Sequence, residues 1–248
     1  MTPSTQLHQS RSGEPSSAKP VLVVGATGKV GRKVVQNLLD QKVRVRALVR
    51  NETKAVELFA NEIVSSAKQA KDGDSPMLEF VVSDLGKPDR RSLQSAVQGC
   101  QSIVSVSGAM RFSKLTDFLP WRIFQQDTSK WCDDTSHPYY ANYKAQKLLV
   151  DLASEYQCKR FVRLTGLSVG FSPFNLVSMI FSSVLSMTTR HHFALEQYLR
   201  NSNVPYVIIR PGGLADEDRV SQYCFTSLDC RNEYLLVNIS ICNHHTSD

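Results

Sequence analysis

The chain has 248 residues, of which 42% are hydrophobic and 21% are charged, and its formal net charge is +6 at pH 7. This length and composition are typical of a single folded α/β domain and exclude a fibrous or wholly disordered protein. The positive charge is modest and no dense run of lysine and arginine occurs. We therefore expect no nucleic-acid-binding arm.

Three further classes of protein are disfavoured by the pattern of apolar residues, cysteines and histidines: membrane-spanning, disulfide-bonded and zinc-binding proteins. The stretch from Leu167 to Met187 contains Pro173, Asn175 and several serines, so its apolar part is too short for a membrane span. The six cysteines lack CxxC pairs, which predicts reduced thiols in an intracellular compartment. No metal is expected, because no common zinc-ligand spacing is matched by Cys224, Cys230, Cys242, His244 and His245.

The first 19 residues are rich in serine and threonine and contain almost nothing that could enter a core. We expect a disordered segment at 1–19, a folded domain at 20–214 and a poorly patterned tail at 215–248. A cytoplasmic location follows as the default. A plastid or mitochondrial location is the alternative, because targeting peptides share this acid-poor, hydroxyl-rich composition.

From Pro20 onward, short β-branched runs alternate with helical patterns, which predicts a doubly wound parallel sheet in a three-layer α/β/α fold. The predicted strands are Val21–Val24, Val43–Val49, Leu78–Val82, Ser102–Val106, Arg160–Leu164 and Val204–Ile209. The predicted helices are Lys29–Asp40, Lys54 to about Lys71, Asp89–Val97, Tyr140–Tyr156 and His191–Arg200.

Two stretches lack a clear period. Gly108–Pro138 is expected to be a long loop over the strand ends, where such sheets bind ligands. After Gly213 the pattern offers one strand, Tyr234–Ile241, and no convincing helix. We expect the chain past Leu214 to be loosely packed.

A glycine-rich turn joins the first strand to the first helix, with Gly25, Gly28 and Gly31 in a G-x-x-G-x-x-G spacing. Glycines at such a turn let backbone N–H groups approach a pyrophosphate, whose charge the helix N-terminus stabilises. The third glycine allows close packing of helix against strand. The sequence therefore predicts a dinucleotide cofactor on the segment that contains Gly25, Thr27, Gly28, Lys29, Val30 and Gly31.

The end of the second strand carries Arg50, preceded by Arg46, where an NAD-specific site usually presents an acidic residue. A guanidinium at this position can form bidentate hydrogen bonds with a 2′-phosphate, which favours NADP over NAD. The alternative is a solvated surface arginine.

Residues after the third and fourth strands are candidates for the adenosine half of the cofactor. Asp84 could accept a hydrogen bond from the adenine amino group with Leu85 against the ring, or it could be a turn aspartate. Ser107, Gly108 and Ala109 are small and would leave room for the ribose.

The motifs GATGKVG, ALVRN, VVSDL, SVSGA, RFVRLTGLSVG and VPYVIIRPGGL together resemble the atypical short-chain dehydrogenase/reductases, in particular the NmrA-like NAD(P)-binding group. The resemblance covers about Val21 to Leu214. It implies a seven-stranded sheet with NADP(H) across the strand ends, and it places Arg210, Pro211 and Gly212 near the nicotinamide.

The resemblance does not extend to the catalytic pair of that group. Tyr143 and Lys147 form a Y-x-x-x-K motif, but it lies on the helix before the fifth strand, whereas the pair of the family lies on the helix after it. An ordinary helix face is the expected reading of this motif.

At the positions that the resemblance assigns to the tyrosine and lysine, the chain has Thr188 and His192. Threonine is too weak an acid, and neutral imidazole lacks a fixed charge. The remaining catalytic candidates are Thr165 or Ser168 for the serine of the family, and His191 or His192 as a proton donor.

Two functions therefore remain open from the sequence. One is a reductase that transfers hydride from NADPH to a small carbonyl or enone held under the 171–187 segment. The other is a non-catalytic sensor, assembly or regulatory protein, in which NADP(H) changes the affinity for a protein partner.

Overall fold

A computed structural model describes residues 19–69, 76–109, 135–166, 169, 188–211, 223–231 and 234–241. The expectations for residues 1–18, for most of the Gly108–Pro138 loop, for the Leu167–Met187 segment apart from Val169, for Gly212, and for Cys242, His244 and His245 lie outside these residues. Within the described ranges, no helix is long and apolar enough to cross a membrane, and no cluster of side chains could hold a metal ion.

The strands are β1 (Val21–Val24), β2 (Val45–Val49), β3 (Leu78–Val82), β4 (Ser102–Ser105), β5 (Arg160–Leu164), β6 (Tyr206–Pro211), β7 (Tyr223–Arg231) and β8 (Tyr234–Ile241). The helices are α1 (Lys29–Asp40), α2 (Glu52–Leu58), α3 (Ala60–Gln69), α4 (Arg90–Val97), the π-helical turn η3 (Tyr140–Lys144), α6 (Ala145–Glu155) and α8 (Thr188–Arg200).

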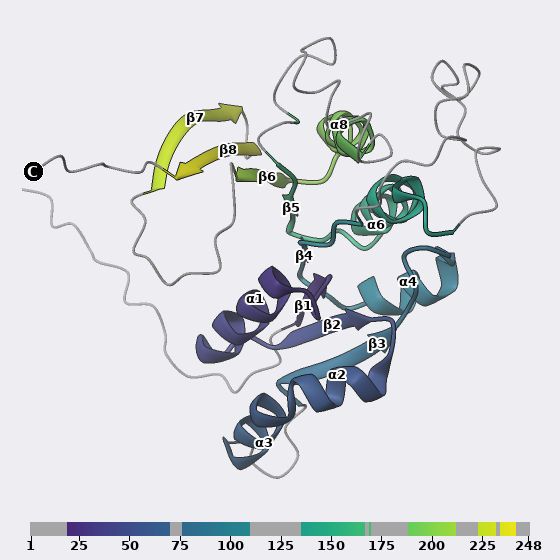
Figure 1. The fold of residues 1–248 in the computed structure, drawn as a ribbon, viewed down its shortest axis with the longest axis vertical. Coiled ribbons are helices and arrows are strands. Elements are labelled where there is room, and N and C mark those ends of the chain that lie inside the picture. Colours follow the sequence, from purple (N-terminus) through teal and green to yellow (C-terminus); the bar gives the residue numbers. More distant parts are fainter. Residues whose placement is uncertain are drawn as a thin grey trace, which may run out of the picture.

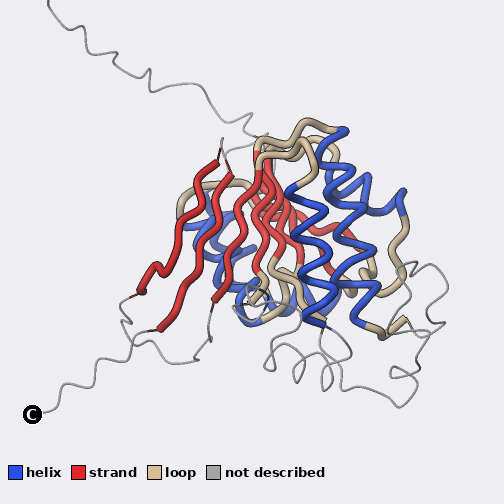
Figure 2. Tube along the Cα trace, turned by 90° about the horizontal axis from the view of Figure 1, so that it is seen from above, coloured by secondary structure: helices blue, strands red, loops and turns tan. Residues whose placement is uncertain are grey.

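All the described strands form one sheet in the order β3-β2-β1-β4-β5-β6-β8-β7. Every neighbouring pair is parallel except β7 and β8, which are antiparallel. Helices cover both faces, with α1, α2 and α3 on one side and α4, α6 and α8 on the other (Figures 1 and 2). The predicted doubly wound α/β fold is confirmed.

Each face of the sheet has its own core, because successive side chains of a strand point to opposite faces. Leu22 and Val24 of β1 belong to the core under α4, α6 and α8. Val23, between them, packs with Val35 of α1 in the second core. All four are fully buried, and burying one such side chain stabilises the fold by about 1.5–3 kcal/mol.

The predicted bounds agree with the structure for β1, α1, β3 and β5. The single helix predicted from Lys54 to about Lys71 is wrong, since the chain forms α2 and α3 with a break at Phe59. At this break the Phe59 ring enters the core and packs 6.0 Å from the Phe80 ring of β3, centroid to centroid. Asn51 starts α2 early because its side chain accepts a hydrogen bond from the Lys54 N–H.

Two other predicted helices begin or continue differently. The helix predicted over Tyr140–Tyr156 starts as the π-helical turn η3 before it becomes α6, and α8 begins at Thr188 rather than His191. Single π-helical turns inside helices are frequent at functional sites. Apolar periodicity alone does not reveal them.

The sheet continues beyond the strands that the resemblance implies. β8 has the predicted bounds and pairs with β6 in parallel. β7 is a strand that the sequence pattern does not indicate; it pairs along β8 from Tyr223↔Ile241 to Arg231↔Tyr234. The described sheet therefore has eight strands rather than seven.

Candidate dinucleotide-binding site

The turn between β1 and α1 requires glycine for backbone conformation and for close packing. Gly25 has a φ of +88°, which L side chains rarely adopt. A Cβ at Gly31 would lie 2.0 Å from the carbonyl oxygen of Gly25. The Gly28 N–H donates to that same carbonyl oxygen at 3.1 Å, so the first two glycines close a tight turn directly before α1.

The N-terminus of α1 faces solvent and lacks a side-chain cap. Gly28 occupies the N-cap position without a capping side chain, and the first turn contains no acidic residue. Thr27, Gly28 and Lys29 are exposed. A helix N-terminus carries a partial positive charge and binds anions through its backbone N–H groups. This end of α1 therefore fits the pyrophosphate of a dinucleotide.

The turn lies at the point where the sheet reverses its order. The chain passes from β1 to β2 on one side, while β4 and the later strands lie on the other side of β1. Ligands bind at such a switch point, outside the carboxyl ends of the strands. Gly25 and Ser107 meet there, since a Cβ at Gly25 would lie 2.8 Å from the Cα of Ser107.

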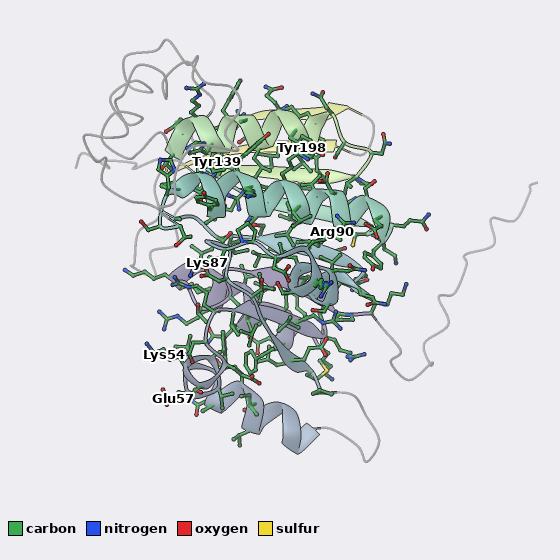
Figure 3. All side chains as sticks on the ribbon, turned by 90° about the vertical axis from the view of Figure 1, so that its right-hand side faces the viewer. Lys54, Glu57, Lys87, Arg90, Tyr139 and Tyr198 are labelled. Atoms are coloured by element: carbon green, nitrogen blue, oxygen red, sulfur yellow. The ribbon has the colours of Figure 1, made fainter. Side chains whose placement is uncertain are left out.

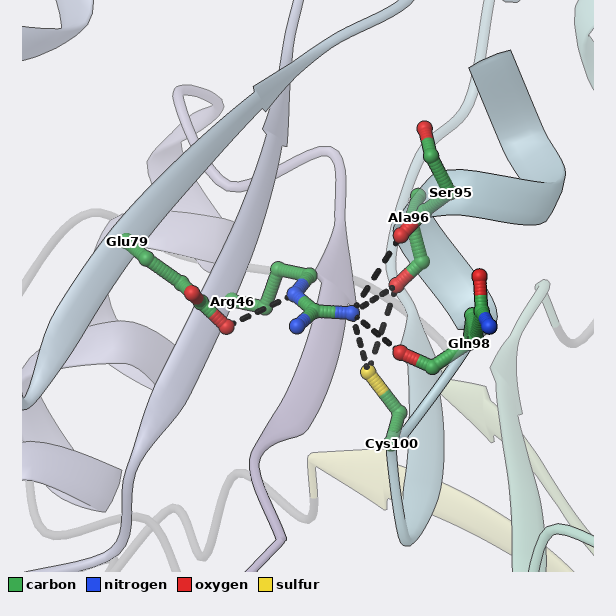
Figure 4. Close-up of polar contacts among 6 residues, drawn as sticks. All are labelled: Arg46, Glu79, Ser95, Ala96, Gln98 and Cys100. Carbon is green, nitrogen blue, oxygen red and sulfur yellow. Dashed lines mark hydrogen bonds and ion pairs between the residues drawn. The ribbon is translucent and has the colours of Figure 1, made fainter. Parts of the chain in front are cut away.

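Arg46 within β2 and Arg50 directly after it have different environments. Arg50 directly follows β2 and is exposed at the same edge of the sheet as the glycine turn. Arg46 lies within β2 and points to the C-terminal end of α4 (Figure 4). Of these two arginines, Arg50 is therefore the candidate for contact with the cofactor.

Arg46 holds three segments together. Its Nε donates to Glu79 of β3 at 2.7 Å, and its Nη1 donates to the carbonyl oxygens of Ala96 at 2.9 Å and Gln98 at 2.6 Å. These carbonyls lie at the end of α4, where a cation is favourable. Cys100 lies beside the guanidinium, and burial raises the pKa of its thiol to about 11.

Asp84 is held as a turn residue. Its Oδ1 accepts a hydrogen bond from the Gly86 N–H at 2.9 Å, and its carbonyl accepts from the Lys87 N–H at 3.0 Å. The carboxylate is exposed. Leu85 packs on the core beneath α4 and α6. A contact of Asp84 or Leu85 with adenine remains a prediction.

The chain after β4 is fixed by two buried amides from the start of the next helix. Asn142 of η3 accepts from the Ala109 N–H and donates to the Ala109 carbonyl, both at 2.8 Å. Gln146 of α6 accepts from the Ser105 hydroxyl at 2.7 Å and donates to the Ser107 hydroxyl at 2.9 Å. The backbone opposite Gly25 is thereby held in one position. Gly108 is exposed between these contacts.

Arg163 of β5 is fully buried and joins the same segment. Its Nη1 donates to the Ser105 hydroxyl at 2.7 Å and to the Ser107 carbonyl at 2.9 Å. Its Nη2 lies 3.2 Å from Nδ1 of His192 on α8. Burial lowers the pKa of Arg163 to about 10, although the charge of Glu196 opposes this shift.

Glu196 of α8 is a buried carboxylate that receives several donors. Arg210 of β6 forms an ion pair with it through Nε and Nη2, and the Thr165 hydroxyl donates to its Oε1 at 2.7 Å. Thr165, a catalytic candidate from the sequence, therefore has its hydroxyl proton committed to a structural bond. The guanidinium of Arg210 is likewise committed to Glu196, and Pro211 ends β6 beside it.

The side chains of Tyr143 and Lys147 have different neighbours. The Tyr143 ring lies 5.8 Å from the Tyr139 ring, centroid to centroid. Lys147 forms an ion pair with Asp151 at 3.1 Å and lies 4.4 Å from the ring centroid of Tyr198. Burial disfavours the charged amine, yet hydrogen bonds with Tyr198 and Asp151 raise the pKa of Lys147. Tyr198 lies on α8 (Figure 3). Its hydroxyl donates to Asp151.

The two candidate proton donors, His191 and His192, lie in the first turns of α8. Thr188 and His191 are buried, and His192 is partly buried. Burial, with the charges of Arg163 and His191, lowers the pKa of His192 well below 6.5. The imidazole of His192 is therefore neutral at pH 7, and an imidazolium acid is not the form present there.

Several residues at this edge of the sheet are not indicated by sequence motifs. They are Asn142, Gln146, Arg163 and Glu196. Their one signal in the sequence is a polar residue at a position that the strand or helix period assigns to the core, as in RFVRL and RHHFALEQ. Such a residue must find a partner when it is buried.

Comparison with known proteins decides the family. A sequence profile for NAD(P)H-binding proteins matches residues 25–233. The chain belongs to this NAD(P)H-binding family. A nicotinamide dinucleotide is accordingly its cofactor, as the turn between β1 and α1 predicts.

Curated relatives of this NAD(P)H-binding chain include proteins with different names. The chain is 33% identical over 201 residues to protein TIC 62, chloroplastic, from Pisum sativum, covering 78% of this chain and 32% of the relative. It is 26% identical over 210 residues to sanguinarine reductase from Eschscholzia californica, covering 78% and 69%. It is 29% identical over 209 residues to photosystem II assembly factor Ycf39 from Cyanophora paradoxa, covering 84% and 50%.

The chain spans about a third of the length of the TIC 62 proteins that it matches. Among solved structures, a putative NAD-dependent epimerase/dehydratase from Bacillus halodurans has a TM-score of 0.57 at 18% identity, covering 84% of this chain and 77% of that one. ChuY, an anaerobilin reductase from Escherichia coli O157:H7, has a TM-score of 0.57 at 18% identity, covering 92% and 100%. At this identity the two structures show the shared fold alone.

Proposed function

We propose that this chain is an NADP(H)-binding module of a plastid protein, and that the bound dinucleotide regulates its affinity for a protein partner. The observation that carries the regulatory reading is the structural commitment of the residues where the resemblance expects catalytic groups. Thr165 donates to the buried Glu196, and Nδ1 of His192 faces Arg163. At the positions where the resemblance expects the catalytic tyrosine and lysine, the chain has Thr188 and His192.

The preference for NADP over NAD rests on Arg50. Its exposed guanidinium follows β2 at the edge of the sheet that carries the glycine turn. In this family of folds the ribose 2′ position is recognised at the end of the second strand. A guanidinium there complements a 2′-phosphate by charge and by bidentate hydrogen bonds.

The plastid location rests on the relatives, because the TIC 62 proteins and an uncharacterised Arabidopsis thaliana protein all carry the word chloroplastic in their names. The sequence-based default of a cytoplasmic location receives no support from these comparisons. The serine- and threonine-rich residues 1–19 are compatible with the plastid alternative.

The regulatory reading requires that the dinucleotide bind one conformation of the protein better than another. Ser105 to Ala109 is the segment that would transmit occupancy, because it lies against Gly25 and is bonded to side chains of η3, α6 and β5. The name of the Ycf39 relative, a photosystem II assembly factor, favours a protein as the partner.

A second candidate function is reduction of a small carbonyl compound, favoured by the similarity to sanguinarine reductase over 69% of that enzyme. In this case the dinucleotide supplies hydride, and the protein positions it beside the substrate. His192 would then contribute as a neutral hydrogen-bonding group.

One assay separates the two candidates. The purified protein is mixed with NADPH and a panel of aldehydes, ketones and enones, and the absorbance of the reduced nicotinamide is followed. We expect NADPH to bind without turnover. Turnover that is abolished by Arg50→Ser or Gly28→Val would contradict the regulatory reading. Glu57→Gln, at an exposed position of α2 outside the candidate site, serves as the control for nonspecific loss.

A further inference from the structure

The ring of His192 is held by Arg163 through one nitrogen. Nη2 of the guanidinium lies 3.2 Å from Nδ1 of the imidazole. A guanidinium can only donate hydrogen bonds, so Nδ1 must be the acceptor. In a neutral imidazole whose Nδ1 accepts, the hydrogen resides on Nε2. The contact therefore selects one of the two neutral tautomers.

Arg163 has no freedom to turn away from this contact. It is fully buried, and its other hydrogen bonds go to the Ser105 hydroxyl and the Ser107 carbonyl. Ser105 is in turn bonded to Gln146. The guanidinium is thus fixed between the segment that faces Gly25 and the first turns of α8.

His192 itself lies where a ligand at the strand ends could be reached. α8 follows β5 and precedes the parallel strand β6, so its N-terminal turns lie at the carboxyl edge of the sheet. Among the described residues, none forms a hydrogen bond with Nε2 of His192, and the side chain is partly buried rather than enclosed.

We propose that Arg163 is a positioning residue that fixes His192 as the Nε2–H tautomer, so that His192 donates a hydrogen bond to a carbonyl oxygen of the bound ligand. This inference rests on the proposed binding of NADP(H) at the strand ends. The carbonyl belongs either to the nicotinamide carboxamide or to a second, carbonyl-containing compound. In both cases His192 acts as a neutral donor and transfers no proton.

The charges around His192 agree with a neutral donor. Arg163 on β5 and His191 on α8 both disfavour a positive charge on the ring, and burial acts in the same direction to hold the pKa of His192 low. The nearest carboxylate of α8, Glu196, is engaged by Arg210 and Thr165. A hydrogen-bond donor that stays neutral keeps its function over the whole physiological pH range.

The test uses the full chain labelled with ¹⁵N in its imidazoles, and long-range ¹H–¹⁵N spectra, with His192→Gln to assign the signals. In the wild-type protein we expect His192 to show a protonated Nε2, an unprotonated Nδ1 and no titration between about pH 6 and 8. In the wild-type protein, a protonated Nδ1 of His192, or titration of His192 near the ordinary histidine pKa of about 6.5, would overturn the proposal.

Variants then separate positioning from general stability. Arg163→Gln should raise the pKa of His192 toward about 6.5 and mix the two tautomers. Ser105→Ala removes another partner of Arg163 but leaves the contact with His192, so it should keep the wild-type signature. An unchanged His192 signature in folded Arg163→Gln would contradict the role of Arg163.

Three ligands distinguish the sources of the carbonyl. A His192 Nε2 signal that moves with NADP⁺ but not with 2′,5′-ADP, which lacks nicotinamide, supports the carboxamide. A signal that moves only when 4-nitrobenzaldehyde is added with NADP⁺ supports a separate carbonyl compound. Calorimetry on the same samples measures dinucleotide binding. Binding without movement of His192 contradicts this inference alone, whereas absence of binding contradicts the proposed function.

Discussion

Gly31 is the glycine of the turn at which a side chain would have the least space. Gly31→Ala would place a Cβ 2.0 Å from the carbonyl oxygen of Gly25, so the turn between β1 and α1 must move. Overpacking of this kind costs about 1–3 kcal/mol. We expect a lower melting temperature by several degrees and loss of NADPH binding, measured by thermal unfolding and calorimetry.

Gly28→Ala is the matched control for Gly31→Ala. The new Cβ would lie 3.4 Å from the Gly25 carbonyl oxygen, which is an ordinary contact, and the residue is exposed. Its melting temperature should therefore stay close to that of the wild type while NADPH binding weakens. Equal losses of stability in the two variants would contradict the geometry of the turn.

Arg46 and Arg50 allow a second test with single substitutions. Arg46→Met breaks the bonds to Glu79 and to the carbonyls at the end of α4, which are partly buried or exposed, so each lost bond should cost about 0.5–1.5 kcal/mol. We expect a less stable protein with an unchanged ratio of NADPH to NADH affinity. Arg50→Met should leave the stability unchanged and lower the ratio of NADPH to NADH affinity. A changed ratio in Arg46→Met would contradict the assignment of the 2′-phosphate contact to Arg50.

At the scale of elements, Glu196 joins α8 to β5 and β6. Glu196→Gln leaves the guanidinium of Arg210 buried without a counter-charge, and breaking a buried pair costs roughly 3–5 kcal/mol. Denaturant unfolding should show this loss. Glu155→Gln is the control, because its pair with Arg90 is about half exposed and such pairs contribute less than about 1 kcal/mol. Similar losses in both variants would contradict a central role for Glu196.

The elements also show how far the sequence predicts the structure. β1, β3 and β5 have strong β-branched or apolar runs, and their predicted bounds agree with the structure. The break at Phe59 was not predictable from periodicity, because it depends on the Phe80 ring of β3. β7 depends on pairing with β8 rather than on its own pattern.

The candidate site also contains one part that the sequence predicts and one part that it does not. The glycine turn is a local motif, so its conformation follows from Gly25, Gly28 and Gly31 themselves. The network of Asn142, Gln146 and Arg163 joins three segments that are far apart in the chain. No spacing of residues indicates such contacts, and only the folded topology brings them together.

At the scale of the whole molecule, His192 predicts an acid-sensitive stability. Its folded pKa lies well below 6.5, mainly through burial, so below about pH 6.5 the unfolded chain binds a proton that the folded chain does not. Stability should therefore fall with falling pH, by up to about 1.4 kcal/mol per pH unit from this residue. Urea unfolding between about pH 5 and 7 should give a flatter dependence for His192→Gln than for the wild type, and equal slopes would contradict the shift.

We propose that the chain binds NADP(H) on the exposed end of α1 with Arg50 at the 2′-phosphate. Calorimetric titration of the wild-type protein and Arg50→Ser with NADPH and NADH tests it most directly. We expect the wild type to bind NADPH at least about tenfold more tightly than NADH, a difference of about 1.4 kcal/mol, and Arg50→Ser to lose this preference while it keeps NADH affinity. Absence of NADPH binding to the wild type, or a preference that survives in Arg50→Ser, would contradict the claim.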